Sequence, residues 1–196
     1  TKNKDLINKW ESKKLNIEII SNKIMGKISE AKTPSGILGI YNLKKSSDLN
    51  LNSKIWLYLD EVSDPGNLGT LIRTASWFNI KNIALSKNSV DPYNSKVIRS
   101  AVGAHTYSNI YSNIDFDVFK NHDYYAIGAD QNSTSTIEKI DTKKKLIIVL
   151  GGEATGISQP IKAKLDEIVS IPKSGYGESL NVSSAGSILM YKLSKK

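Results

Sequence analysis

The residues best suited to chemistry lie in three polar loops, of which residues 64–73 form the first. This loop contains the amide of Asn67 and the guanidinium of Arg73. If a helix begins near Leu68, both lie within two turns of its N-terminus, where the partial positive charge of the helix and a guanidinium together suit a phosphate group. The alternative is a turn that starts a helix, with Asn67 as N-cap, which leaves Arg73 unexplained.

The second loop, residues 151–156, follows the apolar run 146–150. Its first two residues, Gly151 and Gly152, would let a nucleotide-type ligand approach the backbone closely. The loop lacks both the G-x-G-x-x-G spacing and the lysine of a phosphate-binding loop. A simple strand-to-helix turn is therefore the competing interpretation.

The third loop, residues 171–183, leads into an apolar C-terminal segment and holds Ser179, Asn181 and Ser183. Capping of a helix would use one of these three side chains but hardly all of them. Elsewhere, His105 and His122 lie outside the three loops, where ordinary packing explains them. The chain has no cysteine and no metal-ligand spacing, so we predict no metal site.

Alternating apolar runs and helical patterns predict the elements that position these loops. Strands are expected at 55–59, 82–85, 124–128, 146–150 and 168–171, and helices at 68–78, 94–101, 135–140, 160–165 and 182–193. This alternation predicts an α/β fold, with a parallel sheet covered by helices on both faces. In such sheets, ligands gather at the carboxyl ends of the strands, which is where the three loops lie.

The N-terminal part of the chain is expected to be separate. Residues 1–45 predict a small α/β piece, with helices at 5–14 and 21–31 and strands at 17–20 and 37–41. Residues 46–54 have little apolar content and are predicted to be a linker to a larger domain, residues 55–196.

Composition limits the partners and the compartment. The net charge of +8 over 196 residues favours a phosphate backbone as partner, although only two of the 27 basic residues are arginine and abundant lysine also fits compositional drift. No stretch approaches the roughly 18 apolar residues of a membrane span. Because the sequence also shows no apolar signal-peptide region, we expect a soluble cytoplasmic protein.

In their order and spacing, the three loops resemble the motifs of the SpoU (TrmH-type) RNA 2′-O-ribose methyltransferases of the SPOUT superfamily. The similarity extends from about Trp56 to Lys192, and residues 91–93 and 100–104 resemble the middle segment of the family. Lys173 stands where an apolar residue is usual. The motifs are N-x-G-x-x-x-R, matched by Asn67, Gly69 and Arg73; G-x-E-x-x-G, matched by Gly151, Glu153 and Gly156; and I-P-x-x-G-x-x-x-S-L-N-V-S, matched by Ile171, Pro172, Gly175, Ser179, Leu180, Asn181, Val182 and Ser183.

The resemblance implies a C-terminal trefoil knot in the α/β domain, S-adenosyl-L-methionine held in that knot, and a homodimer formed through the knot region. The expected cofactor-binding residues are Gly151, Gly152, Ile171 and Leu180. Residues 21–45 resemble the end of a small ribosomal-protein-like RNA-binding domain, so that residues 1–45 would be a partial or shortened copy of it.

The resemblance also implies catalytic roles. Arg73 would grip a phosphate and stabilise the developing alkoxide. Asn67, Ser179 and Asn181 would orient the ribose or the loops, and Glu153 would fix Arg73 or the loop geometry.

The implied function is methylation of a ribose 2′-hydroxyl in RNA. Ribosomal RNA is favoured over tRNA, because the appended N-terminal domain is commoner among rRNA-directed members. The alternatives are a tRNA 2′-O-methyltransferase, a non-catalytic RNA-binding protein on the same scaffold, and a nucleotide-binding α/β protein with no RNA role.

Overall fold

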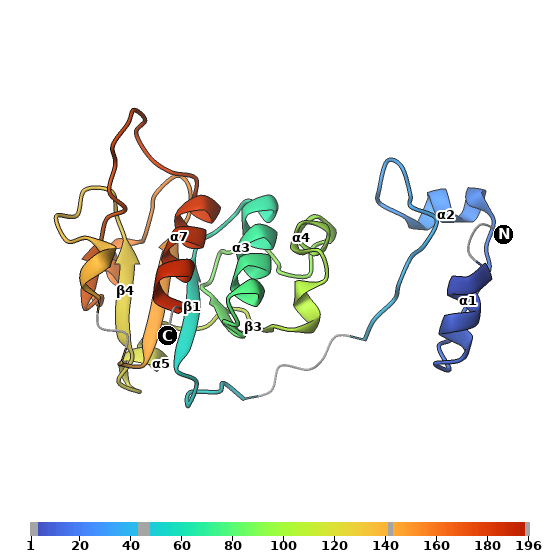
Figure 1. Ribbon diagram of the computed structural model, residues 1–196, viewed down its shortest axis with the longest axis horizontal. Helices are drawn as coiled ribbons and strands as arrows, with labels where there is room; N and C mark the ends of the chain where they lie inside the picture. Colours follow the sequence, from blue (N-terminus) through green and yellow to red (C-terminus); the bar gives the residue numbers. More distant parts are fainter. Residues whose placement is uncertain (1–3, 43–47, 141–142, 195–196) are drawn as a thin grey trace. The chain divides into compact units, whose positions relative to one another are not determined.

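The apolar runs between residues 55 and 169 form a six-stranded parallel sheet of order β3-β2-β1-β5-β4-β6 (Figure 1). The computed structural model describes residues 4–42, 48–140 and 143–194, and the chain divides into two compact units, Thr1–Leu43 and Lys44–Lys196. The sheet belongs to the second unit. Its strands are β1 (Ile55–Asp60), β2 (Asn82–Leu85), β3 (Asn109–Tyr111), β4 (Tyr125–Ala129), β5 (Leu146–Gly151) and β6 (Glu167–Val169).

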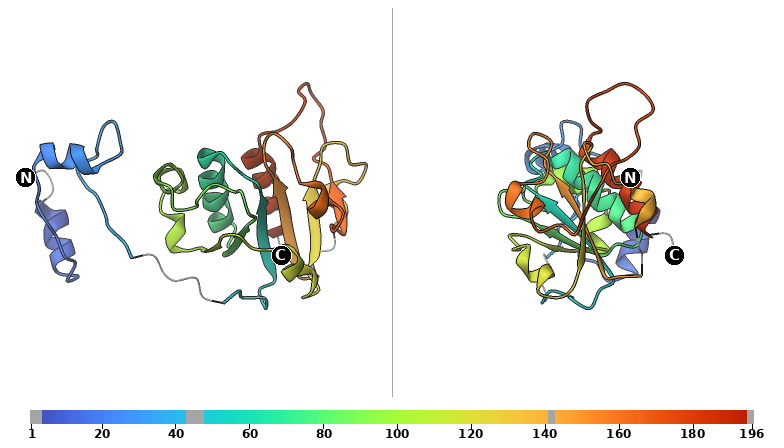
Figure 2. Two further views of the ribbon diagram at one scale, coloured as in Figure 1. Left: turned by 180° about the vertical axis from the view of Figure 1, so that it is seen from behind. Right: turned by 90° about the vertical axis from the view of Figure 1, so that its left-hand side faces the viewer.

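Both faces of the sheet are covered, because successive side chains of a strand point to opposite sides. Leu57 and Leu59 of β1 join an aliphatic core, whereas Trp56 and Tyr58 of the same strand join an aromatic cluster. Helices cover the two faces separately (Figure 2). The aliphatic core includes residues of α3 (Pro65–Trp77), α4 (Ser95–Ala101) and α7 (Val182–Ser194), and the aromatic cluster is packed by residues of α5 (Asp117–Lys120) and α6 (Gln159–Lys162).

Helix α7 lies beside α3, although more than a hundred residues separate them in the chain (Figure 1). A Cβ on Gly186 of α7 would come within 2.5 Å of the Leu71 side chain, so the glycine permits this close approach. The hydroxyls of Thr74 and Ser187 also lie 3.4 Å apart. The last helix is thereby packed closely against the first helix of the sheet domain.

The predicted α/β fold with a parallel sheet is confirmed, with local differences. Strand β3, the short helix α5 and the 3₁₀ turn Ala104–Thr106 were not predicted from the sequence. The helix expected at 135–140 is only a 3₁₀ turn, Ile137–Lys139. Its first part is extended instead, because Ser170 donates a backbone hydrogen bond to Ser135 and Thr136 forms a parallel bridge with Ser170.

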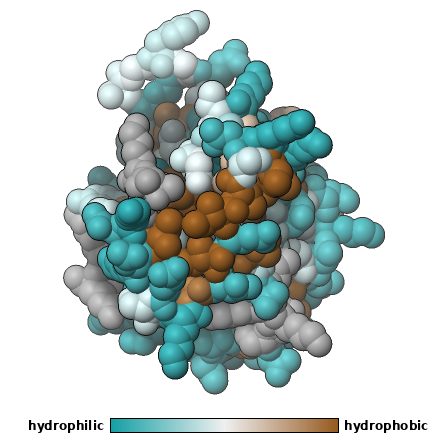
Figure 3. Space-filling model, turned by 90° about the vertical axis from the view of Figure 1, so that its right-hand side faces the viewer, coloured by the Kyte–Doolittle hydropathy of each residue, from teal (hydrophilic) through white to brown (hydrophobic). Residues whose placement is uncertain are grey.

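The N-terminal unit contains two helices, α1 (Lys4–Glu11) and α2 (Asn22–Ile28). Ser21 caps α2 by accepting a hydrogen bond from Ile24 N–H at 3.3 Å. The strands predicted at 17–20 and 37–41 are wrong, because the described part of this unit pairs no strands. No residue among 4–42 is buried. Figure 3 shows one face of the molecule, on which an apolar surface is bordered by hydrophilic side chains.

Residues 46 and 47 of the predicted linker lie outside the described residues. The rest of it contacts the sheet domain, since Leu49 and Leu51 pack against the aromatic cluster. The hydroxyl of Tyr124 also donates to the carbonyl of Leu51 at 3.0 Å. Within the described chain, no helix is long and apolar enough to cross a membrane.

Candidate active site

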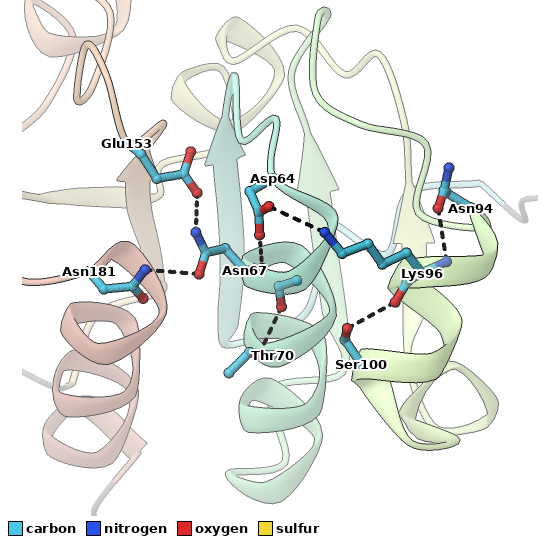
Figure 4. A network of polar contacts seen from close by, with 9 residues as sticks. Asp64, Asn67, Thr70, Asn94, Lys96, Ser100, Glu153 and Asn181 are labelled. Carbon is cyan, nitrogen blue, oxygen red and sulfur yellow. Dashed lines mark hydrogen bonds and ion pairs between the residues drawn. The ribbon is translucent and has the colours of Figure 1, made fainter. Parts of the chain in front are cut away.

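A chain of three side chains joins the three loops at the carboxyl edge of the sheet (Figure 4). The amide nitrogen of Asn67, which belongs to the first predicted loop and lies in the first turn of α3, donates to Glu153 Oε1 in the loop after β5. The amide oxygen of Asn67 accepts from Asn181 Nδ2 at 3.0 Å, and Asn181 lies in the loop after β6, directly before α7. The sequence-predicted residues Asn67, Glu153 and Asn181 are therefore brought together.

The start of α3 sets the position of Asn67. The alternative interpretation, in which Asn67 caps this helix, is wrong, because Asp64 is the N-cap and Pro65 is the first helical residue. The Asp64 carboxylate accepts from Asn67 N–H at 2.8 Å. Proline is well suited to the first helical position, where no N–H is needed. Since Asp64 satisfies the backbone, the Asn67 side chain is left to bridge the other loops.

The side chain of Asn181 is oriented from the opposite side. Its Oδ1 atom accepts from Ser183 N–H at 2.9 Å and from Ser183 Oγ at 2.5 Å. This leaves the Nδ2 group to donate to Asn67. Of the three side chains Ser179, Asn181 and Ser183, Asn181 thus caps α7 and Ser183 orients the Asn181 amide. Ser179, the third, has no hydrogen-bond partner among the described residues and lines the cavity described next.

A cavity of about 740 Å³ opens between the second and third loops. Its volume lies in the range of small-molecule sites, which is roughly 300–1,000 Å³. All four residues predicted to bind the cofactor line it, together with three of the predicted catalytic residues: Gly151, Gly152, Ile171, Leu180, Glu153, Ser179 and Asn181.

The lining is suited to S-adenosylmethionine. Apolar side chains such as Leu150 and Val182 can cover an adenine ring, and the backbone of the second loop offers polar groups without side chains in the way. Asp130 and Lys162 add charges on the wall for the polar parts of the molecule. The residues present therefore fit the cofactor.

The two glycines at the start of the second loop are required by the loop itself. A Cβ on Gly151 would lie 2.0 Å from the carbonyl carbon of Gly156, and one on Gly152 would lie 2.6 Å from the carbonyl oxygen of Glu61. Both distances are far below ordinary van der Waals contact. The glycines thus allow the loop to fold back on its own backbone and onto the end of β1.

Asp130 and Lys162 were not predicted as site residues. They form an ion pair at the cavity wall, and the Lys162 ammonium, which donates to the carboxylate, lowers the pKa of Asp130. The sequence carried a signal for Asp130 as a site residue, because Asp130 directly follows β4 and so lies at the carboxyl edge of the sheet.

Arg73 is not brought to the other predicted residues within this chain. It is exposed on α3, does not line the cavity, and has no hydrogen bond or ion pair among the described residues. It lies six positions after Asn67 on the helix, so the two side chains leave α3 on different faces. Glu153 bonds to Asn67 rather than to Arg73.

The two histidines also lie away from the cavity. A ring nitrogen of His105 is 2.7 Å from the carbonyl oxygen of Pro92, and one of His122 is 2.8 Å from that of Val118. No group of three potential metal ligands occurs among the residues that the structure describes.

Comparison with known proteins assigns the chain to a family. Residues 54–191 match the SpoU rRNA Methylase family, which is 138 of the 196 positions. The chain belongs to this family. The prediction that the chain is an S-adenosylmethionine-dependent RNA methyltransferase of the SpoU family is therefore confirmed.

Individual relatives agree with the assignment. The chain is 29% identical over 180 residues to the 23S rRNA (guanosine(2553)-2′-O)-methyltransferase RlmP of Bacillus subtilis, covering 89% of this chain and 71% of that protein. A TrmH-family structure from Porphyromonas gingivalis superposes with a TM-score of 0.74 at 28% identity, covering 90% of this chain and 73% of that one. An AdoMet-bound rRNA methyltransferase from Sinorhizobium meliloti gives a TM-score of 0.67 at 26% identity, covering 71% of this chain and 55% of that one. This chain thus spans little more than half of the Sinorhizobium protein.

Proposed function

We propose that this chain transfers the methyl group of S-adenosylmethionine to a ribose 2′-hydroxyl of ribosomal RNA. The observation that carries the proposal is the Glu153–Asn67–Asn181 network, which ties all three family motifs together at the mouth of a cavity that fits the cofactor. The names of RlmP and of the Sinorhizobium relative support rRNA as substrate class. The net charge of +8 supports a phosphate-rich partner, and such a substrate would place the protein in the cytoplasm.

The cofactor supplies an electrophilic methyl group on a sulfonium, so the protein has to orient the hydroxyl and ease loss of its proton. In this proposal Gly151, Gly152, Ile171 and Leu180 bind the cofactor. The network holds the second and third loops in register, so that the exposed Ser179 hydroxyl can meet the ribose.

Arg73 is proposed to come from a second copy of the chain. Its guanidinium would grip a phosphate and stabilise negative charge that develops on the 2′-oxygen. Its exposure on α3, away from the cavity of its own chain, supports an action across a dimer.

A homodimer through α3 and α7 forms part of the proposal, together with the C-terminal trefoil knot that the family assignment favours. Apolar side chains are exposed on the two adjacent helices. Trp77 of α3 is 84% exposed and Tyr191 of α7 is 51% exposed, and the Tyr191 ring lies 6.0 Å from that of Phe78. Exposed apolar surface of this kind is typical of protein interfaces.

The N-terminal unit is proposed to assist RNA binding. Residues 1–45 would be part of the ribosomal-protein-like domain that the sequence suggests, and residues 46–54 would connect it to the methyltransferase domain at 55–196. Lysines are frequent in this unit, and contacts between lysine and phosphate weaken as salt increases.

Transfer of a tritiated methyl group from labelled cofactor to unmodified rRNA and tRNA tests the function. We expect label in rRNA, located at a ribose 2′-oxygen by resistance of the adjacent bond to alkaline hydrolysis. Label in tRNA alone would replace rRNA as substrate class. RNA binding without any label would favour the non-catalytic alternative, and the Asn67→Ala variant serves as the inactive control.

A further inference from the structure

We propose that Asp60, a residue outside the family motifs quoted above, is a positioning residue that holds the second loop against the sheet through one hydrogen bond. The consequence for cofactor binding rests on the function proposed above, whereas the effect on the loop does not. Asp60 is the last residue of β1 and is only 2% exposed. A carboxylate buried to this degree is costly unless a partner compensates it.

The partner is the backbone of Ser158, two residues after the end of the second loop. Asp60 Oδ2 accepts from the N–H of Ser158 at 2.8 Å. In the sheet, Asp60 lies opposite Gly151, the first residue of the same loop. The loop therefore leaves the sheet beside Asp60 and returns to its carboxylate seven residues later.

Between these two points the loop is closed on itself. Gly156 N–H donates to the carbonyl of Gly152 at 2.9 Å, and the same pair forms an antiparallel bridge. Gly152 also packs against the carbonyl of Glu61, so the loop rests on the end of β1. Glu153 lies within this closed segment and carries the contact to Asn67.

The support beneath the loop is itself fixed from the other side. Glu61 N–H donates to Ser86 Oγ at 2.8 Å, and Ser86 N–H donates to the carbonyl of Leu59 at 2.9 Å. The end of β1 is thus tied to β2, and the Asp60 carboxylate transmits this rigidity to the loop that lines the cavity. Loss of the carboxylate should release the return point at Ser158 while the sheet stays intact.

Four variants isolate this single bond. Asp60→Ala removes the acceptor, whereas Asp60→Asn keeps an oxygen in the same place. Ser158→Pro removes the donor, and the φ of −61° at Ser158 already suits proline. Ser158→Ala keeps the N–H and removes a hydroxyl that makes no capping bond.

Two measurements on the full chain follow: hydrogen exchange of the peptide that contains residues 152–158 without cofactor, and calorimetric binding of S-adenosylhomocysteine. A hydrogen bond to a charged group contributes about 1.5–3 kcal/mol, so Asp60→Ala should weaken binding by roughly 10- to 100-fold and speed exchange of the Ser158 amide. Ser158→Pro should lose affinity similarly, and the double variant should be no worse than Asp60→Ala. Ser158→Ala should match the unmodified protein, and Asp60→Asn should lie in between.

Asn82→Ala is the matched control for loss of a buried polar side chain. Asn82 is 4% exposed and accepts from Asn109 Nδ2 at 3.0 Å, but it begins β2 at the opposite edge of the sheet. It should lower the melting temperature and leave affinity unchanged. The inference is overturned if Asp60→Ala, folded, shows unchanged exchange at residues 152–158, or if its affinity equals that of Asn82→Ala. If the unmodified protein itself binds no S-adenosylhomocysteine, the proposed function fails instead, and the exchange result still decides the role of Asp60.

Discussion

Substitution of Gly151 by alanine tests whether the close packing of the second loop creates the cofactor cavity. An added Cβ would lie 2.0 Å from the carbonyl carbon of Gly156 and 2.1 Å from the nitrogen of Ile157, where ordinary contact begins near 3.4 Å. Both neighbours are backbone atoms, which no rotamer change can move. The loop must therefore shift by about an ångström or more.

The cost can be bounded from general values. Overpacking by one methyl group destabilises a protein by about 1–3 kcal/mol. For a domain of this size, each kcal/mol corresponds to roughly 2–4 °C in melting temperature, so we expect a fall of roughly 2–12 °C. Because the displaced backbone lines the cavity, affinity for S-adenosylhomocysteine should fall at least about 10-fold, equivalent to about 1.4 kcal/mol.

Gly175→Ala is the control, since a Cβ at that position meets nothing within 4 Å. It lies in the third loop, has no left-handed φ, and should leave melting temperature and affinity nearly unchanged. Scanning fluorimetry and calorimetry on both variants give the comparison. A Gly151→Ala protein with the melting temperature and affinity of Gly175→Ala would show that the loop yields without cost, and would refute the packing argument.

Three further substitutions address the charges around the site. Asn67→Asp places a carboxylate against Glu153, so methyl transfer at neutral pH should fall at least about 10-fold and recover partly when Glu153→Gln is added; no recovery would argue against direct contact. Arg73→Lys should retain cofactor affinity and lose most of the transfer rate, because lysine lacks the planar fork; full activity would remove the proposed clamp. Lys162→Met removes the cation that lowers the pKa of Asp130, so it should reduce the melting temperature at neutral pH. A depressed carboxyl pKa stabilises the fold at a pH above the unfolded value of about 3.8, and this stabilisation is lost as the pH falls through the folded pKa. The difference in melting temperature between Lys162→Met and the unmodified protein should therefore shrink in acid. In an Asp130→Asn background, the effect of Lys162→Met should be small at every pH.

The strands of the sheet centre could be predicted because they are buried on both faces. The run 146–150 is continuous and apolar, and it forms β5 with one more residue, Gly151. The edge strand β3 could not be found in this way, since it is three residues long and begins with an exposed Asn109. In the N-terminal unit the opposite error occurred, because apolar runs without a neighbouring strand to pair with do not form a sheet.

The parts of the site that depend on backbone geometry could be predicted from the sequence. The parts that depend on which side chains pair with each other were harder to predict. Loops after parallel strands meet at one edge, so the gathering of the second and third loops around the cavity follows from strand order, whereas Leu180 as a lining residue was implied by the family resemblance. The alternative that Asn67 caps α3 is wrong, and the sequence carried a signal for Asp64 in the Asp-Pro pair that precedes Asn67. Asp60 had no signal, because a carboxylate at the end of an apolar run does not reveal the N–H, 98 residues later, that it will accept.

The pairing of β1 with β5 has a consequence for synthesis of the protein. Ile55 lies opposite Leu146, so one long edge of β1 stays open until about ninety further residues have left the ribosome. At roughly 5–20 residues per second this takes about 5–20 s, far longer than local helix formation. During that interval β2 and α3 can already pack on β1, but an apolar strand edge remains exposed to other nascent chains. Translation pauses placed before residue 146 should therefore increase aggregation and chaperone occupancy, whereas pauses after β6 should have little effect.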